Sequence, residues 1–492
     1  MVKVARIALG SVVLFLFAFL LSLVPPGVVN KADASGLSAG TPVTIALNFE
    51  VIQFPDQGAF IDGQNRTLVP VRFFAQAFDS QGLSVQVDWD GENRKVTLVL
   101  RERAVPGQIA GEMPGLAGLD HPERKETRVE LFVGEEEALV NGETRQLDTS
   151  VQVYNGRAMI PLRFVSEVFG AEVGYESQFR QVNIQSKGVE RTNRLVHNPY
   201  QDIDWDSIQR HKSALHFHTD ESDGDLTPEE AIELYHDRGF TIMSITDHDN
   251  MGRPGPTWPW PFVSEGVLPI MGNELSCQHH ITSYFTDYYG HEGGNEHESL
   301  AAVEADGGLA AFAHPGRYNN PEGWRWYVPY YEKYDSLFGL EVYNMGDRFP
   351  RDRELWDRLL SYFMPHRPIY GMSNDDMHLK RTLGINWNTL LLDNLTAAEA
   401  RKALEEGRFF FSVSLVGAAP DIERVVVSDG AVEVVPRFGQ VKWVSDGKVI
   451  HEGQRLEYRS NSQVQRYARA CVFTEHGRTY TQPFGFQAEI RQ

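Results

Sequence analysis

The chain has 492 residues, too many for one hydrophobic core, and its length predicts about three domains of ~150 residues each. Its formal net charge of −21 at neutral pH disfavours nucleic acid and anionic lipid as partners, because lysine and arginine supply most of the affinity for phosphate groups. The two cysteines, Cys277 and Cys471, stand in different predicted domains, so any metal site must be built from histidine and carboxylate.

Residues 1–34 have the pattern of a secretory signal. Lys3 and Arg6 precede an apolar run over residues 7–24, and Ala32-Asp33-Ala34 fits a small-x-small cleavage site. The alternative is an uncleaved anchor, since this run is at the lower length limit for spanning a bilayer of ~30 Å. We expect cleavage after Ala34 and a secreted or cell-surface protein, with membrane contact only if the segment is retained.

Residues 41–186 contain a duplicated motif. Residues 66–74 match residues 157–165, and a turn dipeptide precedes each copy. Each copy continues into an amphipathic stretch and an alternating strand pattern, and a Gly/Pro-rich linker at about 101–127 separates the copies. The pattern predicts a duplicated strand-helix-strand module of the α+β class.

This module resembles the copper amine oxidase N-terminal-like domain, which is commonly appended to exported bacterial enzymes and surface proteins. The resemblance implies a stalk or surface-association domain, with a cell-wall or surface polymer as its expected partner. A packing scaffold without a ligand is the alternative. The region carries no metal signal, because its one histidine, His121, stands in the linker.

Histidines are concentrated in the next region. Twelve of the sixteen lie between His211 and His378. Short apolar runs such as residues 240–246 and 309–313 predict buried parallel strands, and capped helices are expected to begin at Thr227 and Thr396. Strands that alternate with helices favour an α/β barrel or a doubly wound sheet over residues 205–412.

Potential metal ligands stand at the ends of these strands. His216 and His218 alternate on one strand and therefore point the same way. The carboxyl ends of parallel barrel strands meet at one mouth, so groups that are distant in the sequence converge there. The later strands end at Asp247-His248, Glu274, His314-Pro315 and Asp376-Met377-His378.

In combination these motifs resemble the PHP family of metallophosphoesterases, which is named for its members in DNA polymerases and histidinol phosphatases. The resemblance implies a distorted, TIM-like (β/α)7 barrel that binds two or three divalent ions, with manganese, zinc or iron suited to such ligands. The implied first ion is held by His216, His218, Glu274 and Asp376. Glu274 bridges to a second ion held by His280 and His314, and the third is held by Asp223, His248 and His378.

Two positions in this ligand set need comment. His280 fits the family's strand better than its neighbour His279, and we favour it as the ligand. Asp375 stands where the family usually has serine, which affects the hydrogen bonding around the ligands and not the ligation itself.

Paired cations lower the pKa of a bridging water and neutralise charge on phosphoryl oxygens, so hydroxide would attack the ester. Arg317 lies three residues beyond His314 and could bind phosphate through two hydrogen bonds, although a surface arginine paired with an acidic neighbour is the alternative. Asp247 is expected to orient a ligand and is counted with Asp376 and Arg317 among the catalytic residues. The sequence therefore predicts an exported phosphoesterase that hydrolyses small phosphomonoesters or phosphodiesters.

Two other functions remain open. The same metals could serve a hydrolase of carboxylic or carbamate esters or amides, for which Arg317 would matter less. A non-catalytic cell-surface binding protein is the other alternative. Residues 413–492 alternate like strands and predict a small β-sandwich with no readable function.

Overall fold

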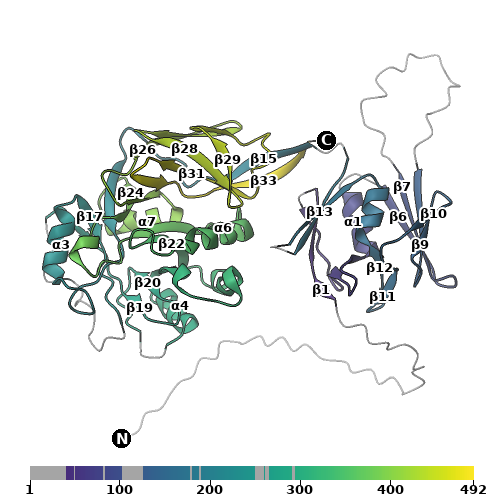
Figure 1. Cartoon of the computed structure of the whole chain (residues 1–492), viewed down its shortest axis with the longest axis horizontal. Helices are drawn as coiled ribbons and strands as arrows, with labels where there is room; N and C mark the ends of the chain where they lie inside the picture. Colours follow the sequence, from purple (N-terminus) through teal and green to yellow (C-terminus); the bar gives the residue numbers. More distant parts are fainter. Residues whose placement is uncertain are drawn as a thin grey trace, which may run out of the picture.

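The computed structural model describes residues 40–491 except 49, 81–83, 102–125, 178–179, 188–189, 250–259, 261–264 and 291–293. The predicted signal segment and almost all of the linker, including His121, lie outside these residues. No helix among the described residues is long and apolar enough to cross a membrane. The chain is a multidomain α/β protein, with an N-terminal module beside a larger body (Figure 1).

The two copies of the repeated motif pair with each other in the N-terminal module. Strand β5 (Thr67–Pro70) runs antiparallel to β12 (Arg157–Pro161), with Val69 opposite Ile160. Each strand leads directly into a helix, α1 (Val71–Ser80) or α2 (Leu162–Val168), whose apolar face is buried in one shared core. The remaining strands of the module extend this sheet and form two others: β1 (Thr41–Pro42), β2 (Thr44–Leu47), β3 (Glu50–Val51), β4 (Phe60–Ile61), β6 (Ser84–Asp90), β7 (Lys95–Arg101), β8 (Glu126–Phe132), β9 (Glu137–Val140), β10 (Glu143–Gln146), β11 (Gln152–Tyr154), β13 (Glu172–Glu176) and β14 (Gln181–Gln185).

The histidine-rich region contains two groups of strands. Strands β16 (Gln209–Ala214), β17 (Phe240–Met243) and β18 (Leu268–Pro269) are parallel neighbours. In the second sheet, β21 (Leu309–Phe312), β22 (Leu337–Asn344) and β23 (Tyr370–Asn374) are parallel, whereas β19 (Glu274–Leu275) and β20 (Ile281–Tyr284) pair antiparallel. Single bridges from Phe217 to Met377 and from His248 to Glu274 join the two groups. The joins occur at the strand ends where the predicted ligands stand.

Two helices of this body begin where the sequence predicts. Helix α3 (Pro228–His236) has Thr227 as its N-cap and a complete capping box with Glu230. Helix α7 (Ala397–Glu406) begins after Thr396 and ends at Gly407, which adopts a positive φ of 73°. The other helices are α4 (Glu296–Ala305), α5 (Val328–Lys333) and α6 (Arg351–Phe363).

The C-terminal strands share a sheet with the histidine-rich region. Strand β25 (Phe409–Ser414) pairs with β24 (Asn386–Leu392) on one edge and with β32 (Gly477–Tyr480) on the other. This eleven-stranded sheet also includes β15 (Glu190–His197), which pairs with the last strand, β33 (Phe484–Arg491). The sheet therefore crosses the boundary expected near residue 412, because β25 offers both of its edges for pairing. Its other members are β16, β17 and β18 and the C-terminal strands β28 (Gln440–Ser445), β29 (Lys448–Glu452) and β31 (Tyr467–Phe473). Strands β26 (Ile422–Ser428), β27 (Ala431–Pro436) and β30 (Arg455–Glu457) form a separate three-stranded sheet.

Buried polar contacts tie the C-terminal strands to the rest of this body. Arg469 donates to both oxygens of Asp357 at 2.8 and 2.7 Å, and both side chains are buried. The amide of Gln482 pairs with the backbone of Gly371 through two hydrogen bonds of 2.9 and 2.8 Å. Since Gly371 lies on β23, the strand that leads to Asp376, the C-terminal region supports the predicted site directly.

Candidate metal centre

His216 and His218 follow β16 and point to the same side, as their alternation predicts. Their Nε2 atoms lie 3.2 Å apart, and both rings are fully buried. The backbone of this segment is held against residues 376–377, because His218 N donates to Met377 O and Asp376 N donates to His216 O. Main-chain hydrogen bonds thus join the segment of His216 and His218 to the segment of Asp376.

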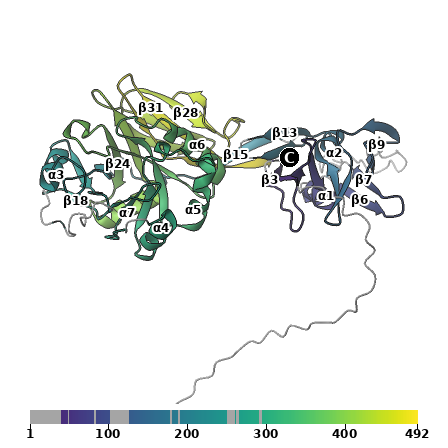
Figure 2. The same ribbon diagram turned by 60° about the horizontal axis from the view of Figure 1, so that its bottom comes forward.

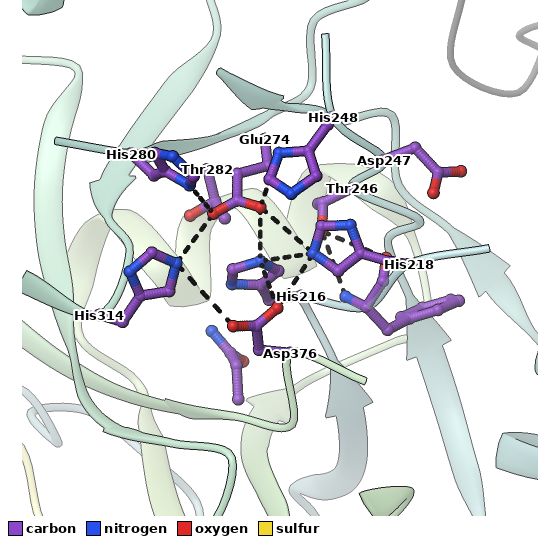
Figure 3. A network of polar contacts seen from close by, with 12 residues as sticks. His216, His218, Thr246, Asp247, His248, Glu274, His280, Thr282, His314 and Asp376 are labelled. Carbon is purple, nitrogen blue, oxygen red and sulfur yellow. Dashed lines mark hydrogen bonds and ion pairs between the residues drawn. The ribbon is translucent and has the colours of Figure 1, made fainter. Parts of the chain in front are cut away.

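Four ligand atoms converge at these histidines, as Figure 3 shows. Glu274 Oε2 lies 3.3 Å from His216 Nε2 and 3.2 Å from His218 Nε2, and Asp376 Oδ1 lies 3.4 and 3.0 Å from the same two nitrogens. Ligand atoms about 2.0 to 2.1 Å from a tetrahedral ion are separated by about 3.3 Å. Asp376 Oδ1 is buried and has no hydrogen-bond partner. The four atoms therefore have the spacing that suits a divalent ion, and Asp376 Oδ1 has no hydrogen bond that such an ion would have to replace.

Glu274 lies between two halves of the cluster. Its Oε2 faces His216 and His218, whereas its Oε1 lies 2.8 Å from His280 Nδ1 and 3.0 Å from His314 Nε2 (Figure 3). His248 Nδ1 lies 3.3 Å from Oε2, so His248, Glu274 and His280 form a further ligand group. One buried carboxylate thus has one oxygen directed to each half, which is the arrangement of a bridging ligand.

A third group contains Asp223, His248 and His378, with His218 beside them. Asp223 Oδ2 lies 3.2 Å from His378 Nε2 and 3.7 Å from His248 Nε2. This group is more exposed than the first one, since His248, His378 and Asp223 are only partly buried. All nine predicted ligands are brought together in one continuous cluster.

His279 and His280 point in different directions. His280 Nδ1 contacts Glu274, whereas His279 Nδ1 lies 2.9 Å from the hydroxyl of Tyr327. The His279 ring is stacked on Trp326, with 3.8 Å between centroids. The alternation of side chains along the segment places His280 at the metal centre and His279 in the aromatic core.

The ligand groups open into a cavity of about 210 Å³ whose lining includes two arginines, Arg317 and Arg348. Arg317 is placed by the short 3-10 segment Pro315–Arg317, which follows His314 directly. His314 itself adopts a left-handed φ of 31°, and Asp376 a φ of 45°, a conformation that costs a non-glycine residue of order 1–3 kcal/mol. Sequence reasoning missed Arg348, because it follows β22 in a loop without a motif.

Glu341 is a second residue that sequence reasoning missed. It lies on β22 with no exposed surface, and its Oε1 accepts from His216 Nδ1 at 2.7 Å and from Asn374 Nδ2 at 2.8 Å. Its Oε2 accepts from the backbone N of His314 at 2.9 Å and from Asn344 Nδ2 at 2.8 Å. A glutamate within the otherwise apolar run 339–343 was the available signal. Glu341 orients the His216 ring so that Nε2 faces the ligand cluster.

Asp247 does not line the catalytic cavity. Its carboxylate accepts from Thr219 N, Thr219 Oγ1 and Ser222 Oγ at 2.7, 2.6 and 2.5 Å, and in Figure 3 it points away from Glu274. Ser222 Oγ in turn lies 3.4 Å from His218 Nδ1. Asp247 therefore positions the loop beside the ligand His218, in keeping with the orienting role expected of it, and its part in catalysis stays a prediction.

Asp375 has a structural role of its own. It is buried, and it accepts from the hydroxyl of Tyr235 and from the backbone N of Asn386. These bonds hold the turn before β24 against the end of β23. The aspartate that stands at this position thus finds donors and does not disturb the ligands.

Burial and charge give the ligands different proton affinities. Burial lowers the pKa of His248 to about 4. Burial also disfavours the charged form of His218, but the carboxylates of Asp376 and Glu274 outweigh it and raise that pKa to about 10. A cation must displace the proton from such an imidazole, so proton release accompanies metal binding.

Comparison with known proteins identifies the N-terminal module. Residues 46–184 match the family model of the copper amine oxidase N-terminal domain. This module is similar to the copper amine oxidase N-terminal domain. The match confirms the resemblance predicted for residues 41–186, and it covers the module alone. No curated protein matches the chain.

Several solved structures are similar to part of this chain. A two-domain protein from Bacteroides vulgatus, described as containing a predicted PHP-like metal-dependent phosphoesterase, is 15% identical with a TM-score of 0.35, over 60% of this chain and 92% of that one. An amidohydrolase from Chromobacterium violaceum with bound sulfate and no metal is 17% identical with a TM-score of 0.26, over 34% and 87%. A lesion-specific endonuclease from Pyrococcus furiosus is 17% identical with a TM-score of 0.27, over 40% and 56%. These TM-scores are too low to support an argument, so the functional conclusion rests on the geometry of the site.

Proposed function

We propose that this chain is a metal-dependent phosphoesterase that hydrolyses small phosphomonoesters or phosphodiesters. The observation that carries the proposal is the position of Glu274, whose two oxygens face two halves of a nine-ligand cluster. The donors are imidazole and carboxylate, which suit manganese, zinc or iron. Two or three such ions, when bound, supply a water of lowered pKa and neutralise the charge that develops on phosphoryl oxygens.

The chain's own residues support phosphate as the reacting group. Arg317 and Arg348 line the cavity that holds the ligand groups, in a chain whose net charge is −21. A guanidinium donates two parallel hydrogen bonds to phosphate oxygens and is always protonated. The two arginines therefore bind and orient the phosphoryl group, Glu341 holds His216, and no serine or cysteine is among the described residues of the cavity lining.

A second candidate keeps the same metal centre. A hydrolase of carboxylic or carbamate esters or amides would use the same ligands, and it would depend much less on Arg317 and Arg348. A non-catalytic surface protein is disfavoured by the cluster itself, because all nine predicted ligands converge on it. Turnover of phosphate esters separates the first function from the other two, and bound metal separates the two hydrolases from the non-catalytic protein.

We also propose the organisation that surrounds this centre. The two groups of strands that meet at the ligands form a distorted (β/α)7 barrel over residues 205–412, followed by a β-sandwich over 413–492. Residues 1–34 direct export, and the N-terminal domain presents the enzyme at a cell-wall or surface polymer. The signal pattern of the first residues and the duplicated module support this arrangement.

The first test combines metal analysis with hydrolysis. Protein purified from Ser35 onward is analysed for bound metal and assayed with an aryl phosphomonoester and an aryl phosphodiester, with and without chelator. Two or three transition-metal ions and chelator-sensitive turnover are expected. Replacement of His216 or His314 by Ala should abolish turnover while the N-terminal domain stays folded. Bound metal without phosphate-ester turnover would favour the second candidate, and absence of metal after repletion would rule out both hydrolases.

A further inference from the structure

A second cavity lies beside the segment that carries Arg317. It has a volume of about 240 Å³, and residues of two 3-10 segments, Pro315–Arg317 and Gly323–Tyr327, and of helix α6 line it. Figure 2 shows α5 and α6 on the same side of the larger body. The described lining of this cavity includes none of the nine metal-ligand candidates. The cavity is therefore adjacent to the metal centre and separate from it.

Two consecutive residues, Arg317 and Tyr318, line the two cavities. Arg317 lines the catalytic cavity, and its neighbour Tyr318 lines the second one. The Tyr318 ring centroid lies 5.9 Å from that of His314 and 6.0 Å from that of His280, and its hydroxyl accepts from the backbone N of His280 at 3.1 Å. Tyr318 is thus both a wall of the second cavity and a direct neighbour of two metal-ligand candidates.

The second cavity suits a flat ring. Its lining combines the apolar surfaces of Tyr318, Trp324 and Leu355 with polar side chains, among them Asn319, Arg351, Glu354 and Arg358. Its volume exceeds the ~150 Å³ that is enough for benzene in an apolar cavity. Its wall is preformed, because Arg351 donates to Gly316 O at 2.8 Å and to Asn319 Oδ1 at 2.9 Å. Ligand sites of this kind combine aromatic walls with a few polar groups at fixed positions.

We propose that the second cavity binds the leaving group, and that the substrates are phosphate esters of alcohols that carry an aromatic ring. This inference rests on the proposed function. Arg317 holds the phosphoryl group while the ring of the ester lies against Tyr318 and Trp324. In the reaction, the oxygen of water bonds to phosphorus, the bond from phosphorus to the ester oxygen breaks, and the alcohol leaves with a proton.

The test compares two esters of primary alcohols, 2-phenylethyl phosphate and propyl phosphate, whose leaving groups are chemically alike. With the metal-loaded protein we expect kcat/KM to be about tenfold higher for the ring ester, from burial of the ring. Trp324→Ala should reduce kcat/KM for the ring ester to the value for propyl phosphate and leave kcat/KM for propyl phosphate unchanged. Equal kcat/KM values for the two esters in the native protein would overturn the inference.

Two further variants separate binding from a structural effect. Leu355→Trp should fill the cavity and remove the preference for the ring ester. Its kcat/KM for propyl phosphate should equal that of the native protein. Trp89→Ala is the control, because Trp89 lies on the N-terminal domain and is 49% exposed. It should leave kcat/KM for both esters unchanged. An equal loss for both esters in Trp324→Ala would assign Trp324 a structural role and contradict the proposal.

Equilibrium binding distinguishes this inference from the proposed function. The phosphonate analogues of the two esters, which cannot be hydrolysed, are titrated into the metal-loaded protein by calorimetry. Tighter binding of the ring analogue that is lost in Trp324→Ala would support the cavity assignment. If this binding were seen but neither ester were hydrolysed, the phosphoesterase proposal alone would fail. Hydrolysis of both esters with equal binding of the two analogues would overturn the cavity assignment alone. Absence of both binding and turnover would overturn both proposals.

Discussion

Glu341 Oε1 lies 2.7 Å from His216 Nδ1, and neither side chain has any exposed surface. The carboxylate accepts the Nδ1 proton and leaves Nε2 free to face Glu274 and Asp376. The other Glu341 oxygen binds the backbone of His314, so one buried residue fixes ligands on both sides of Glu274. Its substitution is therefore the most direct test of how the centre is held.

Replacement of Glu341 by Gln should weaken metal binding about 10–100-fold, a range typical for residues that orient a ligand. The amide has one acceptor oxygen where the carboxylate has two, so at least one of its present donors loses its partner. Competition with a chromogenic chelator measures the affinity. Glu405→Gln, on the exposed face of α7, is the matched control, and unchanged affinity in Glu341→Gln would show that His216 is held by other contacts.

The neighbouring histidines 279 and 280 should respond differently to alanine. His280→Ala removes a contact to Glu274 and should lower the number of bound ions by one. His279→Ala should keep the metal content and reduce the free energy of unfolding by about 1–3 kcal/mol, because it leaves a gap beside Trp326. Elemental analysis and urea denaturation of both variants decide this, and metal loss in His279→Ala alone would reverse the assignment.

Arg317→Ala and Arg348→Ala should each lower kcat/KM for phosphate esters by about 10–100-fold, since a hydrogen bond to a charged group is worth about 1.5–3 kcal/mol. Arg317→Lys should recover only part of the loss, because an ammonium cannot donate two parallel hydrogen bonds. Carboxylic esters assayed in parallel provide the comparison. If the loss is equal for both kinds of ester, the arginines do not act on phosphate.

The ion pair of Arg469 and Asp357 should be essential for stability. Arg469→Met leaves a buried carboxylate without its partner, which costs about 3–5 kcal/mol. The exposed pair of Arg459 and Asp429 is the control, and Arg459→Met should change the free energy of unfolding by less than about 1 kcal/mol. Equal effects of the two variants on urea denaturation would mean that the C-terminal strands do not depend on this contact.

Asp352 should make stability depend on pH. Burial raises the pKa of this carboxyl from 3.8 to about 8, so between these values the folded protein keeps a proton that the unfolded chain releases. This contribution to stability therefore falls as pH rises towards 8, by up to about 1.4 kcal/mol per pH unit. Asp352→Asn removes this pH dependence. The free energy of unfolding of the variant minus that of the native protein should therefore increase from pH 5 to pH 8. A constant difference at the two pH values would contradict this prediction.

Local patterns in the sequence predicted some of the ligands, and the resemblance to the PHP family implied the full set. Alternation along a strand places His216 and His218 on one side. His314 and Asp376 follow strands of a parallel set, whereas Glu274 begins a strand that pairs antiparallel with β20, so their convergence depends on the fold. The capping boxes at Thr227 and the stop at Gly407 are short-range effects. Such features are determined by residues within a few positions of each other.

The supporting contacts could not be predicted, because they join residues that are distant in the sequence. Glu341 meets His216 across 125 positions, and Gln482 pairs with Gly371 across 111. Asp247 carries the ligand-like sequence pattern, but the loop donors of Thr219 and Ser222 occupy its carboxylate. The sequence by itself determined which side chains can bind metal, through periodicity and chemical type. Only the tertiary structure decided which buried groups orient them, because each buried hydrogen-bonding group must find its partner in the packed chain.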